Sequence, residues 1–358
     1  MLPGVAGSGG GGRGRVGGIP GHLDRRLRLP HRAGRSHRRQ HRADDSNKRA
    51  PGAFPLLQRR DVRRLPDSVG LPRGIAAVQA RFVDPRPLYE TEAPLSSRVG
   101  AFRQHLVVDS TSRRLFRDVT QEIAGHSPVA DIGCGVGVPL LPVGPTVMDR
   151  LDVIAGDISL RQLQSIREGE SGPRRNLLQF DATRLPFRSE SFGAAVARHM
   201  LYHVRDPRLA AAEAARVIRS DGLFVATTNS SNSRPELQHA HVKAVADLGG
   251  RLVERMSTNF DAESGRSKLT GSFLGVHTEL WSGVLAFPAV DAVLDYYRST
   301  AYYAMAFDSE EHRARLADRV AEILRAQFGD GPAPLTVGGA VFMCRGPIRQ
   351  GDSCGEHL

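Results

Sequence analysis

One stretch decides the fold of this chain: residues 128–137, which read Pro-Val-Ala-Asp-Ile-Gly-Cys-Gly-Val-Gly. A short apolar strand runs here into a loop with glycine at Gly133, Gly135 and Gly137. Glycine is needed where the backbone takes a positive φ, or where a ligand must approach main-chain atoms with no Cβ in the way. Backbone N–H groups of such a loop, leading into a helix, suit an anionic or carboxylate-bearing ligand. The stretch therefore predicts a strand, a ligand-binding loop and a helix in succession.

The spacing of the glycines separates two classes of nucleotide site. A dinucleotide site needs the pattern G-x-G-x-x-G, which would place a glycine where this chain has Val138. The pattern present is D-x-G-x-G-x-G, from Asp131 to Gly137. Ordinary turns also match a glycine pattern of this kind, so the pattern alone does not identify a ligand.

A second strand is predicted over residues 151–155, and an acid, Asp157, follows it. An ionised carboxylate only accepts hydrogen bonds, so Asp157 could accept from both hydroxyls of a ribose. The acid lies 20 residues past Gly137 and would serve a nicotinamide nucleotide equally well. A plain surface aspartate at a strand end is the alternative, so Asp157 alone does not identify the ligand.

Two further segments follow in order: residues 180–187, Phe-Asp-Ala-Thr-Arg-Leu-Pro-Phe, and residues 191–197, Ser-Phe-Gly-Ala-Ala-Val-Ala. With the glycine loop and Asp157 they resemble the ordered motifs of the Rossmann-like (class I) methyltransferases that use S-adenosylmethionine (SAM). The resemblance is nearest to the ubiquinone/menaquinone-biosynthesis type and its small-molecule relatives, and covers residues 127–230.

The resemblance implies SAM as the cofactor, S-adenosylhomocysteine (SAH) as its product, and no metal. Asp157 would hold the ribose, Asp181 would accept from the adenine amine, and the Ala182 N–H would contact a ring nitrogen. The complete set of implied cofactor-binding residues is Asp131, Gly133, Cys134, Gly135, Gly137, Asp157, Ile158, Asp181, Ala182 and Arg198.

Candidate catalytic residues follow the strand at residues 191–197, where the related enzymes carry aromatic and histidine side chains. A neutral amine or phenol needs help in losing its proton, so a base with a pKa near neutrality is useful. His199 and His203 are the candidates for that base, and Tyr202 is the candidate for orienting it. The alternatives are a packing role for either histidine, or a transfer that relies on proximity alone and needs no base.

The chain departs from the family pattern at two places. Gly193 stands where the related enzymes usually have aspartate. After Gly137, the helix expected to follow the loop is interrupted by Pro142, Gly144 and Pro145. We therefore expect this first crossover helix to be short or displaced.

The fold predicted is α/β, a doubly wound, mainly parallel sheet of seven strands with a helical cap insertion. Helices are expected over residues 108–125, 207–218, 236–248, 289–299 and 309–328, and later strands over 223–228, 275–287 and 335–344, with Gly125 left-handed at the end of the first helix. The expected divisions are a tail (1–74), a lid segment (75–126), the SAM-binding core (127–230), the cap with the closing strands (231–346) and a C-terminal tail (347–358).

The net charge of +11 is concentrated at the N-terminus, where residues 1–73 hold 17 Lys and Arg against five Asp and Glu. The remainder is close to neutral, so its charge does not predict a nucleic-acid partner. The tail is rich in Gly, Arg, His and Pro and is predicted to be disordered. It is either a basic arm for nucleic acid or anionic lipid, or a mis-assigned start, since 46 Arg against 3 Lys indicate a GC-rich coding sequence.

Other classes of protein are disfavoured. The chain has no run of about 18 apolar residues for a membrane span and no secretory signal pattern. Its three cysteines are too scattered for a disulfide framework or a zinc cluster. We expect a cytoplasmic monomer or homodimer.

The expected substrate is a small molecule, a natural product or its precursor, methylated on O, N or C. The alternatives are an RNA methyltransferase that uses the basic tail, a non-catalytic SAM-binding protein and a nicotinamide oxidoreductase. Aromatic residues gather in the last third of the chain, where packing is the simplest role for each. The adjacent Tyr302 and Tyr303 are expected to point different ways, with one lining a cavity or meeting solvent.

Overall fold

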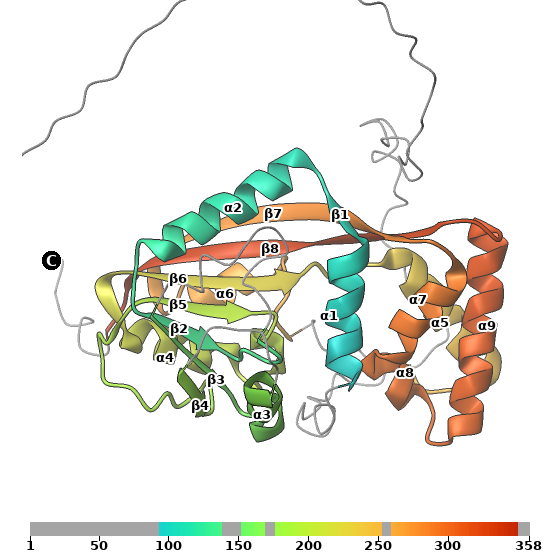
Figure 1. Ribbon diagram of the computed structural model, residues 1–358, viewed down its shortest axis with the longest axis horizontal. Coiled ribbons are helices and arrows are strands. Elements are labelled where there is room, and N and C mark those ends of the chain that lie inside the picture. The colour runs from blue at the N-terminus through green and yellow to red at the C-terminus, as the bar shows by residue number, and fades with distance from the viewer. Residues whose placement is uncertain (1–92, 138–151, 169–175, 253–258, 350–358) are drawn as a thin grey trace, which may run out of the picture. The chain divides into compact units, whose positions relative to one another are not determined.

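The computed structural model describes residues 93–137, 152–168, 176–252 and 259–349. Its centre is a sheet with the strand order β1-β7-β8-β6-β5-β2-β3-β4 (Figure 1). The strands are β1 (Leu106–Val108), β2 (Val129–Ile132), β3 (Val153–Asp157), β4 (Asn176–Gln179), β5 (Phe192–Arg198), β6 (Ile218–Asn229), β7 (Phe273–Phe287) and β8 (Ala333–Pro347). The tail predicted over residues 1–74 and the segment after Gly137 lie outside the described residues.

The sheet is doubly wound, as predicted. Strands β4, β3, β2, β5 and β6 are parallel neighbours, and the later strands are antiparallel, with β8 against β6 and β7 against β8. The chain runs outward from β2 through β3 to β4, then returns to β5 on the other side of β2. The strand order therefore reverses between β2 and β5, and ligands of open α/β sheets bind at the carboxyl ends of the strands at such a point.

The prediction of seven strands is wrong, because residues 106–108 form an additional edge strand, β1, that pairs antiparallel with β7. Three residues are too short a run to show any periodicity in the sequence. The following helix, α2 (Ser110–Ala124), begins later than predicted, where the Asp109 side chain accepts a hydrogen bond from Ser112 N at 2.7 Å. Gly125 ends α2 at φ −74°, so the expected left-handed conformation there is also wrong.

Of the remaining helices in the described ranges, four lie where the periodic patterns predict them and five were not predicted. They are α1 (Ala93–His105), α3 (Leu160–Glu168), the 3-10 turn η3 (Leu201–His203), α4 (Pro207–Val217), α5 (Pro235–Leu248), α6 (Gly265–Leu269), α7 (Val290–Arg298), α8 (Ala301–Ala306) and α9 (Glu310–Phe328). The five that were not predicted are α1, α3, η3, α6 and α8. As expected for an Asp-Pro start, the Asp206 side chain caps α4 by accepting from Arg208 N at 3.0 Å.

The alternation of side chains along β2 divides the core between the two faces of the sheet. Val129 packs in the cluster that contains α2, α5, α7 and α9. Ala130 and Ile132 point to the opposite cluster, where the alanines of α4 pack. Because both faces are covered, the central parallel strands are mostly apolar, and their polar residues, such as Asp131, lie near the carboxyl ends.

Helices α5, α7, α8 and α9 gather beside the long antiparallel pair of β7 and β8, and α1 lies between them and the parallel strands (Figure 1). On α7 the side chains of Val290, Val293, Leu294 and Tyr297 are all buried. Tyr302 and Tyr303 both place their rings against the Tyr297 ring, with centroids 5.8 and 5.0 Å away, and both stay partly exposed. Tyr302 also contacts the His241 ring, with centroids 4.8 Å apart. Tyr302 and Tyr303 lie on the short helix α8, beside α7.

Across the described ranges, no helix is both long and apolar enough to span a membrane.

Candidate cofactor and substrate site

The loop after β2 adopts the conformation that its glycines predict. Gly133, Gly135 and Gly137 have φ values of +69°, +55° and +73°. The N–H groups of Gly133 and Cys134 both donate to the carbonyl of Gly156, at 2.8 and 3.0 Å, which fixes the loop to the end of β3. A Cβ on Gly133 would lie 2.8 Å from Met200 Cγ, so a side chain here is excluded by space as well as by φ.

Asp157, at the end of β3, closes the same loop. Its Oδ2 accepts from Gly135 N and its Oδ1 from Ser159 N, both at 2.9 Å. Burial raises the pKa of the Asp157 carboxyl and the charge of Asp131 adds to this, while the two N–H donors oppose it. Each carboxylate oxygen has a second lone pair, so Asp157 can still accept from two hydroxyl groups.

Asp131 and Arg198 are brought together at the ends of the neighbouring strands β2 and β5. Arg198 Nη2 donates to Asp131 Oδ2 at 2.7 Å, and the two side chains are 7% and 1% exposed. The other oxygen, Asp131 Oδ1, is buried and has no hydrogen-bond partner among the described residues. A buried acceptor without a donor in a native site indicates a place for an absent group. The donor set therefore fits a ligand that presents an N–H or O–H group at Asp131.

The segment after β4 carries the residues predicted to hold an adenine. Asp181 is exposed, and its Oδ1 accepts from the Thr183 N–H and hydroxyl, both at 2.8 Å. Ala182 is buried, whereas Ile158, beside Asp157, leaves 43% of its surface exposed. An exposed apolar side chain among polar groups is a surface on which a flat ring can pack.

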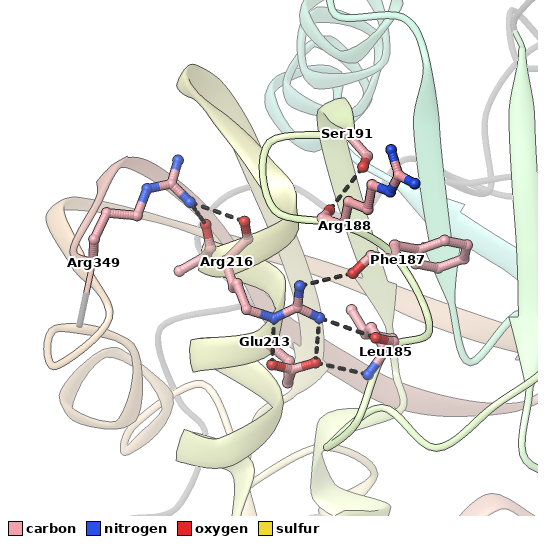
Figure 2. Close-up of polar contacts among 8 residues, drawn as sticks. Leu185, Phe187, Arg188, Ser191, Glu213, Arg216 and Arg349 are labelled. Atoms are coloured by element: carbon pink, nitrogen blue, oxygen red, sulfur yellow. Dashed lines mark hydrogen bonds and ion pairs between the residues drawn. The ribbon is translucent and has the colours of Figure 1, made fainter. Parts of the chain in front are cut away.

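Two side chains of α4, Glu213 and Arg216, form a bracket that holds the next part of that segment (Figure 2). Glu213 Oε2 accepts from Leu185 N at 2.7 Å, and Glu213 binds the Arg216 guanidinium with both oxygens, each at 2.7 Å. Arg216 donates in turn to the carbonyls of Phe187 and Leu185 at 2.7 and 3.0 Å. The hydrogen bond from Arg216 lowers the pKa of Glu213. The bracket fixes the backbone of residues 185–187.

The C-terminal end of α4 is secured by Arg349, which follows the last strand (Figure 2). Its Nη1 donates to the carbonyls of Ala215 and Arg216, each at 2.9 Å. A cation at the C-terminus of a helix satisfies carbonyl groups that have no partner within the helix. The sequence did not reveal Glu213, Arg216 or Arg349 as site residues, because a Glu and an Arg three apart on a helix read as an ordinary surface pair.

The three candidate catalytic residues lie together after β5. His199 has φ 47° and donates its N–H to the Thr227 carbonyl at 2.9 Å. Tyr202 and His203 belong to η3, with ring centroids 4.4 Å apart. Desolvation, then the charges of Arg234 and Arg198, together lower the pKa of His199 to about 4. His199 as a whole residue is nevertheless exposed.

His203 shows the same effect more strongly. Desolvation, then the charge of Arg98, then His199, lower its pKa to about 3. Both histidines are therefore neutral at pH 7 and can accept hydrogen bonds. A base of such low pKa has little tendency to take a proton from a neutral amine or phenol, which is a weaker role than the one expected from the sequence.

The glycine that departs from the family pattern is required by its surroundings. A Cβ on Gly193 would lie 2.4 Å from the His126 carbonyl oxygen and 2.5 Å from Arg219 Nη2. An aspartate at this place could not be accommodated without moving the backbone. The other departure, the helix interrupted after Gly137, lies outside the described residues.

Within the described ranges, no group of three or more His, Cys, Asp or Glu side chains could hold a metal ion.

Comparisons with known proteins agree with this arrangement. A family model described as a methyltransferase domain matches residues 130–226. The chain is 32% identical over 182 residues to a demethylmenaquinone methyltransferase of Renibacterium salmoninarum, covering 51% of this chain and 71% of that protein. It is 27% identical over 146 residues to the uncharacterized methyltransferase YcgJ of Bacillus subtilis, covering 41% of this chain but 58% of the relative, less than two thirds of its length.

Two solved structures are also similar. The structure of YcgJ from Bacillus subtilis has a TM-score of 0.37 and 18% identity, and the match covers 61% of this chain and 91% of that one. The [4+2]-cyclase SpnF has a TM-score of 0.44 and 15% identity, with 75% and 99% covered. The sequence match to the Renibacterium protein and the matching family model, together with the sheet order and the glycine loop, show that the chain belongs to the Rossmann-like (class I) family of SAM-dependent methyltransferases.

Proposed function

We propose that this protein binds SAM and transfers its methyl group to an O, N or C nucleophile of a small molecule, a natural product or its precursor. The observation that carries the proposal is the site at the reversal of strand order. There the left-handed glycine loop, the Asp157 carboxylate and the unpartnered Asp131 Oδ1 meet. Each of them suits a different part of one nucleoside that carries an amino acid.

In this proposal, different residues bind different parts of the cofactor. Asp157 accepts from the ribose hydroxyls, and Ile158 packs against the adenine, which Asp181 and the Ala182 N–H contact. The unpartnered Asp131 Oδ1 accepts from the ammonium group of the methionine part, and Arg198 holds the Asp131 carboxylate in place for it. The loop from Gly133 to Gly137, including Cys134, lets the ligand approach the backbone closely.

The bracket of Glu213 and Arg216 has a positioning role. It holds the backbone at Leu185 and Phe187, a few residues after Asp181, and so fixes the direction of the adenine-binding segment. A site of this kind works best when its binding groups are held in place before the ligand arrives.

When bound, SAM supplies a methyl group on a sulfonium that is already reactive. The protein then has to align the acceptor and exclude water, effects that together lower a barrier by roughly 7–11 kcal/mol. His199 accepts a hydrogen bond from the acceptor in its neutral form, and His203 and Tyr202 keep that region ordered. We expect His199→Ala to lower kcat with little change in SAH affinity; an unaltered rate would remove His199 from the reaction.

Isothermal titration of the full chain with SAH and with NAD tests the function. Binding of SAH and not of NAD is the expected result, and the reverse would identify a nicotinamide enzyme. Transfer of labelled methyl from SAM into the small-molecule fraction of a cell extract then separates an enzyme from a non-catalytic binding protein. Label found in RNA instead would support the nucleic-acid alternative.

A further inference from the structure

Two residues with unusual backbone conformations lie after the ends of neighbouring strands, near the proposed site. Among the described residues, three that are not glycine have positive φ, and two of them are His199, at 47°, and Arg234, at 62°. His199 follows β5 and Arg234 follows β6, so they lie after the carboxyl ends of two neighbouring parallel strands. Such conformations are unfavourable for residues with a side chain and gather at functional sites.

Arg234 is held in this conformation by its surroundings. Its N–H donates to the Thr336 carbonyl at 2.6 Å, and Pro235 starts α5 directly after it. The guanidinium carbon lies 6.0 Å from the centre of the Tyr296 ring, within the range of a cation–π contact. Among the described residues no carboxylate pairs with this guanidinium, whereas Arg198 pairs with Asp131.

A second arginine reaches the same region from another helix. Tyr296 places its ring 6.4 Å from that of Phe102 on α1. One turn earlier on α1, Arg98 Nη1 donates to the Ser299 carbonyl, at 3.1 Å, at the end of α7. Arg98 and Arg234 therefore both contact the C-terminal part of α7, Arg98 through Ser299 and Arg234 through Tyr296.

The charged groups that shift the pKa values of His199 and His203 are all basic. Arg234 and Arg198 act on His199, and Arg98 acts on His203; no acidic group is among the charges that shift either histidine. Asp131 compensates Arg198, whereas no carboxylate of the described residues pairs with Arg234, so the charge of Arg234 is available to a ligand. A positive region beside the reacting groups attracts an anionic ligand and orients it.

We propose that the methyl acceptor carries a carboxylate, which Arg234 binds beside His199. This rests on the proposed function, since it defines the class of acceptor. The guanidinium presents a planar fork of N–H donors that matches a carboxylate with two parallel hydrogen bonds. The carboxylate supplies the negative charge that the described side chains do not.

The test uses the full chain loaded with SAH and two flat probes of nearly the same shape, benzoate and the neutral benzamide. SAH affinity is measured first, so that a chain that fails to bind SAH overturns the proposed function, and not this inference. Wild type is compared with Arg234→Asn, because asparagine tolerates a left-handed φ and suits a helix N-cap, so the fold is retained. Arg325→Gln, which removes an exposed arginine paired with Asp291, is the control.

We expect wild type and Arg325→Gln to bind benzoate at least tenfold more tightly than benzamide, and Arg234→Asn to lose about tenfold in benzoate affinity only, the size of one charge-assisted contact. Benzoate should also move the His199 ring titration, followed by NMR, to higher pH in wild type and not in Arg234→Asn. Equal affinity for the two probes, or an unchanged preference in Arg234→Asn, would overturn the proposal. Tighter binding of inorganic phosphate than of benzoate, lost in Arg234→Asn, would overturn the carboxylate in favour of a phosphorylated acceptor.

Discussion

The Arg198 guanidinium donates to Asp131 Oδ2 at 2.7 Å, across the point where the strand order of the sheet reverses. Both side chains are almost completely buried, and Asp131 Oδ1 has no partner among the described residues. A ligand that donates a hydrogen bond to Asp131 Oδ1 would satisfy the remaining acceptor. The contribution of the ion pair to the free energy of unfolding can be measured without that ligand.

Removing one partner of this pair leaves a buried charge. We expect Arg198→Met to lower the free energy of unfolding by about 3–5 kcal/mol at pH 7, because Asp131 then lies buried without its cation. The double variant Asp131→Asn, Arg198→Met should recover most of this loss, since no charge remains. Urea unfolding of the single and double variants measures both values; a loss under about 1 kcal/mol in the single variant would show that the pair is solvated.

Gly133 tests whether the loop must lie close to its ligand. Gly133→Ala is expected to reduce SAH affinity at least tenfold, because the new Cβ meets Met200 and displaces the loop. Gly249→Ala is the control, since Gly249 has φ +67° and no atom within 4 Å of its Cβ position. Both variants should lose about 1–2 kcal/mol of stability from the left-handed φ. Titration calorimetry that shows the same SAH affinity for both would refute a loop-bound cofactor.

The bracket on the adenine-binding segment makes a different prediction. Glu213→Gln replaces one carboxylate oxygen with an amide donor, which must face either Leu185 N or the Arg216 guanidinium, both donors themselves. We expect SAH affinity to fall about tenfold as the segment loses its fixed position. Glu322→Gln changes another Glu–Arg pair with three-residue spacing, on the surface of α9, and should leave SAH affinity unchanged. Equal affinities in the two variants would assign Glu213 to stability alone.

His241 makes stability depend on pH. It is buried, its Nδ1 lies 2.7 Å from the Tyr297 hydroxyl oxygen, and burial lowers its pKa from 6.5 to about 4. Between these values the unfolded chain takes up a proton that the folded chain does not, so the free energy of unfolding falls as the pH falls from 6.5 toward 4.

We expect His241→Phe to be about 1–3 kcal/mol less stable at pH 7.5, because the buried Tyr297 hydroxyl loses its partner. The same variant should lose stability less steeply than wild type between pH 6.5 and 4, by up to roughly 1.4 kcal/mol per pH unit. Urea unfolding at several pH values measures the slopes; identical slopes would mean that His241 is protonated in the folded state.

The parts of the fold that could be predicted are those in which the signal is local. Strand β2 is a short apolar run that ends in glycine, and α9 has a serine cap and a periodic apolar face, so the residues themselves indicate them. The left-handed glycines after β2 follow from the same kind of local chemistry. Strand β1 was missed because its three residues gain their conformation only by pairing with β7.

The parts of the site that could not be predicted depend on contacts between distant residues. Glu213 lies 28 residues after the Leu185 N–H that it holds. Arg234 acts on His199 only because the loops after β5 and β6 end at the same edge of the sheet. The exclusion of a side chain at Gly193 comes from the His126 carbonyl, which no local pattern places there. Spacing along the chain carries no information on any of these contacts.

The central claim is that one nucleoside with an activated methyl group lies along the ends of β2, β3 and β4. A crystal structure of the full chain in complex with SAH tests it most directly. We predict density there, with the ribose hydroxyls within hydrogen-bond distance of the Asp157 carboxylate, the amino group at Asp131 Oδ1 and the adenine between Ile158 and Asp181. Density for SAH at another place, or these three carboxylates directed away from it, would contradict the account.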